Sequence, residues 1–187
     1  MISVMRHFPL ATVISAHKGL AYATHIPVIY NETTGKLVAH MDRSNPQLST
    51  FTNGSELLVV FNGPDAYISP SIYEVQSLPT WNHIIVHVRG TLKLITNEEA
   101  AKETLISMTE FLEAPSHKYR LTKENERMQR LIDYIVAFEI DINHWEGKFK
   151  LSQDKRGQDF LNAKEVLIKK SGEDATGFIE EMYKSME

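Results

Sequence analysis

Four consecutive residues, Arg43-Ser44-Asn45-Pro46, combine a cation with the start signal of a helix. Ser44 or Asn45 can cap the helix, and proline suits its first position, where the missing N–H costs nothing. The free amide groups of a helix start and a neighbouring arginine together favour an anion such as phosphate. The alternative interpretation is an ordinary capped helix with a surface arginine.

A second stretch, residues 61–95, combines prolines with large aromatic side chains. Three prolines fall within sixteen positions, which predicts a shaped loop between two strands rather than a continuous helix or central strand. Tyr67, Tyr73 and Trp81 gain from burial, yet each carries a polar group that needs a partner. We therefore interpret this loop as a candidate binding surface. The alternative is that the three rings close one end of a barrel core.

The histidines do not predict a metal site. His83 and His87 share one face of a predicted strand, but they lie about 13 Å apart, because a strand rises ~3.3 Å per residue. That distance is too long for both to bind one ion. His25 and His40 could approach each other across paired strands, but no carboxylate is evident as a third ligand.

The sequence contains no motif that assigns catalytic residues. It has no cysteine, which excludes disulfides, a thiolate nucleophile and cysteine-bound metal. Neither GxSxG nor GxGxxG is present, and no carboxylate pair stands out among the 24 acidic residues. The catalytic residues therefore stay unknown, whereas a cofactor site can be inferred.

Strands and helices alternate along the chain and would position these residues. Periodicity and turn signals predict strands at residues 11–15, 20–30, 36–41, 56–62, 82–95 and 134–143. They predict helices at residues 46–53, 98–112, 123–133, 158–169 and 173–185, the last two forming a C-terminal pair over about 157–186. Residues 148–153, KFKLSQ, are predicted to be an extended tail segment. The expected fold class is α+β, with an antiparallel sheet that curls into a barrel and peripheral helices.

Length and composition indicate a single globular domain over residues 1–187, with 42% hydrophobic and 24% charged residues. The net charge is −4, so no global positive field attracts nucleic acid, and no helix-turn-helix is evident. We therefore expect no direct DNA contact. No apolar stretch approaches the ~20 residues of a membrane span, and no signal peptide is visible. A cytoplasmic protein without a membrane segment is expected.

Four phrases together resemble the motifs of one known family. They are HMDRSNPQ, FNGPDAYISPSIY, PTWNHIIVHVRG and EGKFKLSQ, and they occur in the family order across roughly residues 9–160. The sequence is similar to the PaiB-type FMN-binding proteins, a family described as negative transcriptional regulators. The resemblance implies the FMN-binding split β-barrel fold, which is similar to that of pyridoxamine phosphate oxidases.

The same resemblance implies FMN as cofactor and a homodimer that binds it at the subunit interface. It places one group, from Thr24 to Asn45, on one side of the flavin. A second group, from Trp81 to Gln153, lies on the other side, and the partner chain contributes Lys150 and Gln153 of this group. The implied cofactor-binding residues are Thr24, His25, His40, Arg43, Ser44, Asn45, Trp81, Asn82, Lys150 and Gln153.

The chain differs from the family pattern at several positions, most notably at Asp65, where a histidine is usual, and at Ile72, where a tryptophan is usual. An aspartate near a flavin phosphate would repel it, and the lost tryptophan removes a stacking surface. Three functions therefore stay open: a flavin-binding negative regulator of transcription, an FMN-dependent oxidoreductase, and a flavin-free relative with a binding role.

Overall fold

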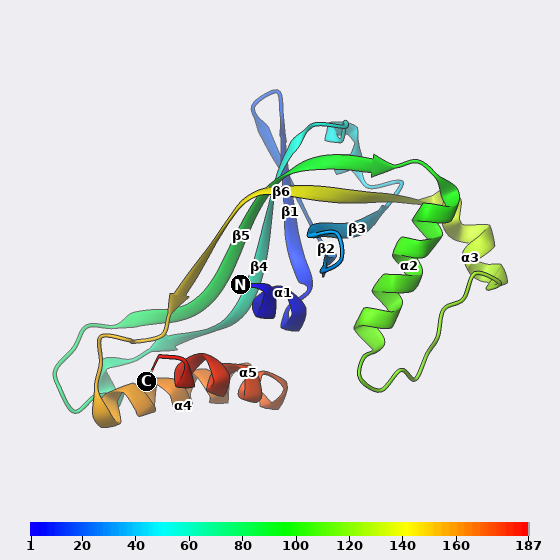
Figure 1. Cartoon of the computed structure of the whole chain (residues 1–187). Coiled ribbons are helices and arrows are strands. Elements are labelled where there is room, and N and C mark those ends of the chain that lie inside the picture. The colour runs from blue at the N-terminus through cyan, green and yellow to red at the C-terminus, as the bar shows by residue number, and fades with distance from the viewer. Residues whose placement is uncertain (187) are drawn as a thin grey trace.

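The structure is a computed structural model that describes residues 1–186, so the last residue of the domain predicted over 1–187 lies outside the described residues. Six antiparallel strands close into a barrel in the order β1-β2-β3-β6-β5-β4 (Figure 1). The strands are β1 (Leu10–His17), β2 (Leu20–Asn31), β3 (Lys36–Asp42), β4 (Glu56–Ile68), β5 (Thr80–Ile95) and β6 (Ile135–Lys150). The predicted α+β fold, an antiparallel split barrel with peripheral helices, is confirmed.

The helices lie outside the barrel. They are α1 (Ile2–His7), α2 (Glu98–Glu113), α3 (Glu126–Leu131), α4 (Gly157–Ser171) and α5 (Glu173–Lys184), with short 3-10 helices η1 (Pro46–Thr50), η2 (Pro70–Ile72) and η3 (Ile132–Tyr134). In Figure 1, α2 and α3 lie together on one side, while α4 and α5 lie under the far end of the long β4–β5 arm. None of the helices in residues 1–186 is long and apolar enough to cross a membrane.

Alternating side chains build the barrel core. Along β5, every second residue from Asn82 to Leu92 is buried, and the residues between them are half-buried or exposed. The pairing of β5 with β6 shifts register between Arg89 and Gly90. A Cβ at Gly90 would lie 2.5 Å from the carbonyl oxygen of Asp141, so this close approach of two backbones requires glycine.

Strand β4 is longer than predicted. The strand does not end at Asn62, because a bulge between Asn62 and Asp65 absorbs Gly63-Pro64, and pairing with β5 then resumes. A proline can occupy such a bulge because the irregularity does not require its missing amide. The loop predicted within residues 61–95 therefore shrinks to residues 69–79. Tyr67 and Trp81 are paired strand residues, not loop residues.

Three other predicted boundaries were also wrong. Strand β6 continues to Lys150, so the first three residues of KFKLSQ pair with β5 instead of forming a separate tail. The helix predicted at 46–53 is a five-residue 3-10 helix. The helix predicted at 123–133 is a six-residue α-helix followed by a 3-10 turn.

Candidate functional site

The first group of predicted residues lies around the turn after β3, and we call Thr24 and residues 42–45 the turn cluster. The Asn45 amide nitrogen donates to the Thr24 hydroxyl at 3.2 Å. The Asn45 oxygen accepts from the Gln47 amide at 2.9 Å, so of the two predicted caps, Ser44 and Asn45, it is Asn45 that caps η1. These contacts fix the turn against β2.

The charged groups of the turn cluster bind neighbours in the same chain. The Arg43 guanidinium donates to the carbonyl oxygens of Asp133 and, at 3.2 Å, Ile135. The Ser44 hydroxyl and amide both donate to the Asp42 carboxylate, and these bonds lower the pKa of Asp42. Arg43 keeps its positive charge beside the turn, but the Ser44 amide points at Asp42. The Asp42 carboxylate therefore occupies the Ser44 amide, which the sequence pattern predicted to bind the anion of a ligand.

His25 and His40 are brought to the outer face of the barrel next to the turn cluster. Side chains alternate along a strand, so Thr24 faces inward and His25 outward. His40 lies on the same outer face, half-buried, with no hydrogen-bond partner for Nδ1. Burial lowers its pKa, so the ring is neutral near pH 7. No group of three His, Asp or Glu residues within 1–186 is placed to hold a metal ion.

The second group lies at the far end of the β4–β5 arm, around a pocket of about 720 Å³. We call its lining side chains Tyr73, Asn82, Lys150, Ser152 and Lys155 the tip cluster. Asn82 is fully buried, and its side-chain amide exchanges two hydrogen bonds with the Ser152 hydroxyl, at 3.0 and 3.1 Å. The Tyr73 hydroxyl lies 3.1 Å from the same Ser152 oxygen. One wall of the pocket is therefore a closed polar network.

Helix α5 supports this network from behind. Tyr183 is 1% exposed, and burial raises its pKa to about 12, against the opposing effect of the nearby Asn82 side chain. Its hydroxyl has no hydrogen-bond partner of normal geometry. Tyr183 therefore acts as a neutral, mostly apolar backing for Asn82.

Lysines form the other side of the pocket. Lys150 donates to the Thr80 hydroxyl, and Lys155 donates to the Ser77 hydroxyl at 3.0 Å while its ammonium lies 5.2 Å from the centre of the Tyr73 ring. Gln153 folds back on its own turn, where it accepts from the Leu151 amide and donates to the Phe149 carbonyl. Two cations therefore border the pocket, and Gln153 shapes the turn between them.

Trp81 lies on the outer surface of the arm. It is 49% exposed, and its ring centre lies 6.0 Å from that of Tyr67, its partner across the strands. The indole Nε1 donates to Asp65 at 2.9 Å, so the aspartate that departs from the family pattern orients this ring. Exposure excludes the alternative in which Tyr67 and Trp81 close a barrel core. Ile72 packs against the core cluster.

The two clusters lie far apart within one chain (Figure 1). His40 is next to Ala137 on β6, and Ala137 is next to Ile95 on β5. Trp81 precedes Ile95 by fourteen residues on the same strand, about 46 Å of strand path at ~3.3 Å per residue. The two clusters therefore lie toward opposite ends of β5.

Three residues of the site escaped the sequence analysis: Ser152, Lys155 and Asp159. Ser152 adopts a left-handed backbone with φ of 61°, a conformation that its residue type does not signal. Lys155 belongs to a short run of basic residues, a pattern that predicts a solvated surface. Asp159 reaches the site through contacts 84 and 85 residues away in sequence, which no local pattern reveals.

The family described as "Putative FMN-binding domain" matches residues 1–144. The chain belongs to this FMN-binding family. It is also 31% identical, over 83% of its length, to 77% of the Bacillus subtilis protein called Protease synthase and sporulation protein PAI 2.

Solved structures agree with the fold. The FAD and heme binding protein of Mycobacterium smegmatis matches with a TM-score of 0.63 and 19% identity, over 87% of this chain and 75% of that one. The flavocytochrome Anf3 of Azotobacter vinelandii matches with a TM-score of 0.59 and 16% identity, over 83% and 65%. At these identities the likeness concerns the fold alone.

The residues present fit the family cofactor, FMN. Ligand pockets usually measure ≈ 300–1,000 Å³, so the pocket of about 720 Å³ has a suitable size. A phosphate is matched by Arg43 in the turn cluster and by the two lysines of the tip cluster, and an isoalloxazine ring is matched by the exposed Trp81. Asp65 accepts a hydrogen bond from Trp81 and does not border the pocket, so its carboxylate lies beside the aromatic surface and not among the lysines that match a phosphate.

Proposed function

We propose that this protein binds FMN in sites shared between two copies of the chain. The separation of the turn cluster from the tip cluster carries this proposal, because Arg43 and Trp81, which the family pattern places at one flavin, lie at the two separate clusters of each chain. In a two-fold dimer, each site would take one cluster from each copy. Two equivalent sites would then form from one interface.

The division of labour within such a site follows from the side chains. Arg43 of one copy would hold the phosphate, while Trp81 and the pocket of the partner copy would contact the flavin ring. Bound FMN would supply redox chemistry. The protein would bind and orient it, and the buried network around Asn82 would keep the wall of the pocket fixed.

The cofactor proposal has a direct test. The purified protein should be yellow, or should take up added FMN in a one-to-one ratio per chain, with FAD and riboflavin as comparison ligands. Riboflavin lacks the phosphate, so it should bind at least about 10-fold more weakly if a charge-assisted bond to phosphate contributes. A colourless protein that takes up none of the three would favour the flavin-free alternative.

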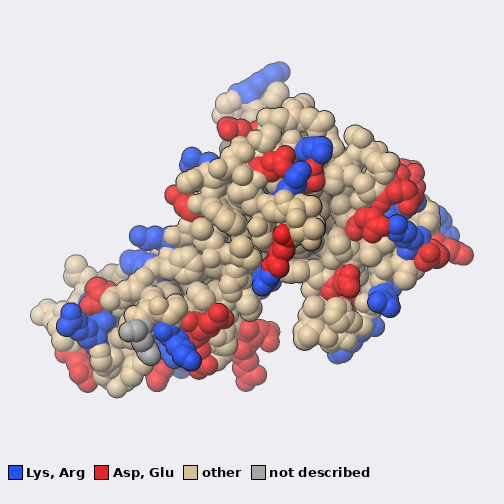
Figure 2. Space-filling view, viewed as in Figure 1, with Lys and Arg blue, Asp and Glu red and all other residues tan. Residues whose placement is uncertain are grey.

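We infer a regulatory role for the bound flavin from the similarity to PAI 2, whose name contains the words protease synthase and sporulation. Direct DNA contact is not part of this proposal. The net charge is −4, and Figure 2 shows acidic and basic side chains interspersed over the face in view. Regulation would then pass through a partner or a small molecule. A gel shift at low salt should show no DNA binding, and a salt-sensitive shift would contradict this inference.

The oxidoreductase alternative makes a different prediction. Addition of NADH or NADPH to the flavin-loaded protein would bleach the flavin colour within seconds, and a substrate would restore it. A regulatory flavoprotein should show slow bleaching or none. This measurement separates the two roles without knowledge of the substrate.

A further inference from the structure

Helix α4 holds the loop that borders the tip pocket. Asp159, in the first turn of α4, is 6% exposed and accepts from the backbone amides of Glu74 at 2.7 Å and Val75 at 3.5 Å. Asn162 donates from its side-chain amide to the Ile72 carbonyl at 2.7 Å. Residues three apart on a helix share a face, so α4 presents both groups to the same loop.

The loop depends on these contacts because it makes few others. Residues 74–76 and 78–79 are exposed, and Val75 and Leu78 are 69% and 84% exposed. The backbone hydrogen bonds of η2 end at Tyr73. Beyond that point the loop is tied by Asp159 at its start and by Lys155 at Ser77. An exposed segment of this kind opens easily unless side chains from a packed element hold it.

Helix α4 is fixed independently of the loop. Ala163 and Leu167 on the inner face of α4 are fully buried. Phe160 of the same helix packs on Tyr183 of α5 with ring centres 5.0 Å apart. Gln158 donates to the Asn162 side-chain oxygen at 2.8 Å, which leaves the Asn162 nitrogen to donate to the loop. The packing of α4 therefore does not depend on its bonds to the loop, as a positioning element requires.

We infer that Asp159 and Asn162 are positioning residues that hold residues 72–79 in the conformation that binds flavin. This inference rests on the FMN-binding function proposed above. The two residues touch the loop on either side of Tyr73 and do not line the pocket, and they act through Tyr73, which does line it. They also lie beyond residue 144, outside the part of the chain that the FMN-binding family matches.

The test uses the full-length protein with Asp159→Ala, Asp159→Asn and Asn162→Ala, and with Asp174→Asn as the control at an exposed first-turn carboxylate of α5. Hydrogen exchange of the 74–75 amides should accelerate at least about 10-fold in Asp159→Ala and less in Asp159→Asn, because the asparagine keeps one acceptor oxygen. The FMN dissociation constant should rise about 10-fold in parallel, in line with the loss of a charge-assisted contact. Exchange in the barrel strands and all values for Asp174→Asn should stay at wild-type levels.

Each part of the inference can fail separately. Unchanged exchange at 74–75 in all three variants would overturn the anchoring itself. Faster loop exchange with wild-type FMN affinity would overturn the link between the loop and the flavin. Faster exchange throughout the barrel would show a general structural role instead. If the wild-type protein takes up no FMN, the proposed function fails, while the exchange of the 74–75 amides still decides whether Asp159 anchors the loop.

Discussion

The turn cluster and the tip cluster are built in opposite ways. In the turn cluster, Arg43 and Ser44 bind groups close by in the same chain, and the cluster belongs to the part matched by the FMN-binding family. In the tip cluster, Asn82 and Ser152 form a buried network around an open pocket, supported by helices beyond the matched part. The comparison teaches that a motif can place cations near a ligand, whereas the shape of the pocket depends on elements that the motif does not contain.

The largest stability effect should come from the buried centre of the tip cluster. Asn82→Ala leaves the Ser152 hydroxyl without its main partner, and an unsatisfied buried polar group costs about 1–3 kcal/mol. We expect the free energy of unfolding to fall by about 2 kcal/mol in a denaturant titration. Asn143→Ala, which removes an exposed bond to Thr91, should change it by less than about 0.5 kcal/mol. Equal losses in both variants would contradict the special role of the network.

Tyr183→Phe should have a smaller effect of the opposite sign. The phenol is buried and its hydroxyl has no normal partner, so its removal should stabilise the protein by about 1 kcal/mol at pH 7. Because the folded pKa of about 12 exceeds the unfolded value of 10, the wild type also loses stability as pH rises from 10 towards 12. The variant should lose less over the same interval. A destabilised variant at pH 7 would show that the hydroxyl makes a useful bond.

His40 gives the turn cluster a weaker pH dependence. Burial lowers its folded pKa below the usual 6.5, so the unfolded state binds the proton more readily. The wild type should therefore lose stability as pH falls below about 6.5, and His40→Gln should lose less of it. Parallel curves for the two proteins between pH 7 and pH 5 would show that the ring is solvated in solution.

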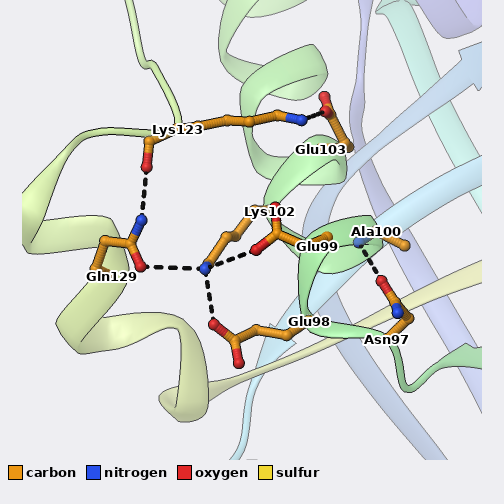
Figure 3. Close-up of polar contacts among 8 residues, drawn as sticks. All are labelled: Asn97, Glu98, Glu99, Ala100, Lys102, Glu103, Lys123 and Gln129. Carbon is orange, nitrogen blue, oxygen red and sulfur yellow. Dashed lines mark hydrogen bonds and ion pairs between the residues drawn. The ribbon is translucent and has the colours of Figure 1, made fainter.

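The smallest effect should arise far from both clusters, in the polar group that joins α2 to α3 (Figure 3). Lys102 is covered by the side chains of Glu98, Glu99 and Gln129, with 2.7 Å to Glu98 and 3.1 Å to each of the others. Lys102 is buried, but its partners Glu98 and Glu99 are mostly exposed to water. Since exposed carboxylates form weak ion pairs, Lys102→Met should lower the melting temperature by only about 1–2 °C and leave FMN affinity unchanged. A changed FMN affinity would connect this region to the site and weaken the contrast.

The sequence predicted the fold well wherever a local signal existed. Alternation located β5, the cap of η1 is one of the two residues predicted for it, and the closed sheet followed from the strand pattern. The extension of β4 was missed because a bulge hides the pairing across Gly63-Pro64. The tip pocket could not be foreseen, since the bonds from Asp159 cross 84 and 85 residues of sequence and have no periodic signal.

The sharpest measurement is the FMN content of a mixed dimer. Arg43→Glu removes the cation proposed to hold the phosphate and Trp81→Ala removes the aromatic surface proposed to contact the flavin ring, so each homodimer should bind little FMN. In a heterodimer of the two, purified through two different tags, one of the two shared sites combines the intact Arg43 with the intact Trp81. We predict about one FMN per heterodimer, half the wild-type amount, by flavin absorbance. A heterodimer as empty as its parents would show that each chain builds its own site, and would contradict the shared site.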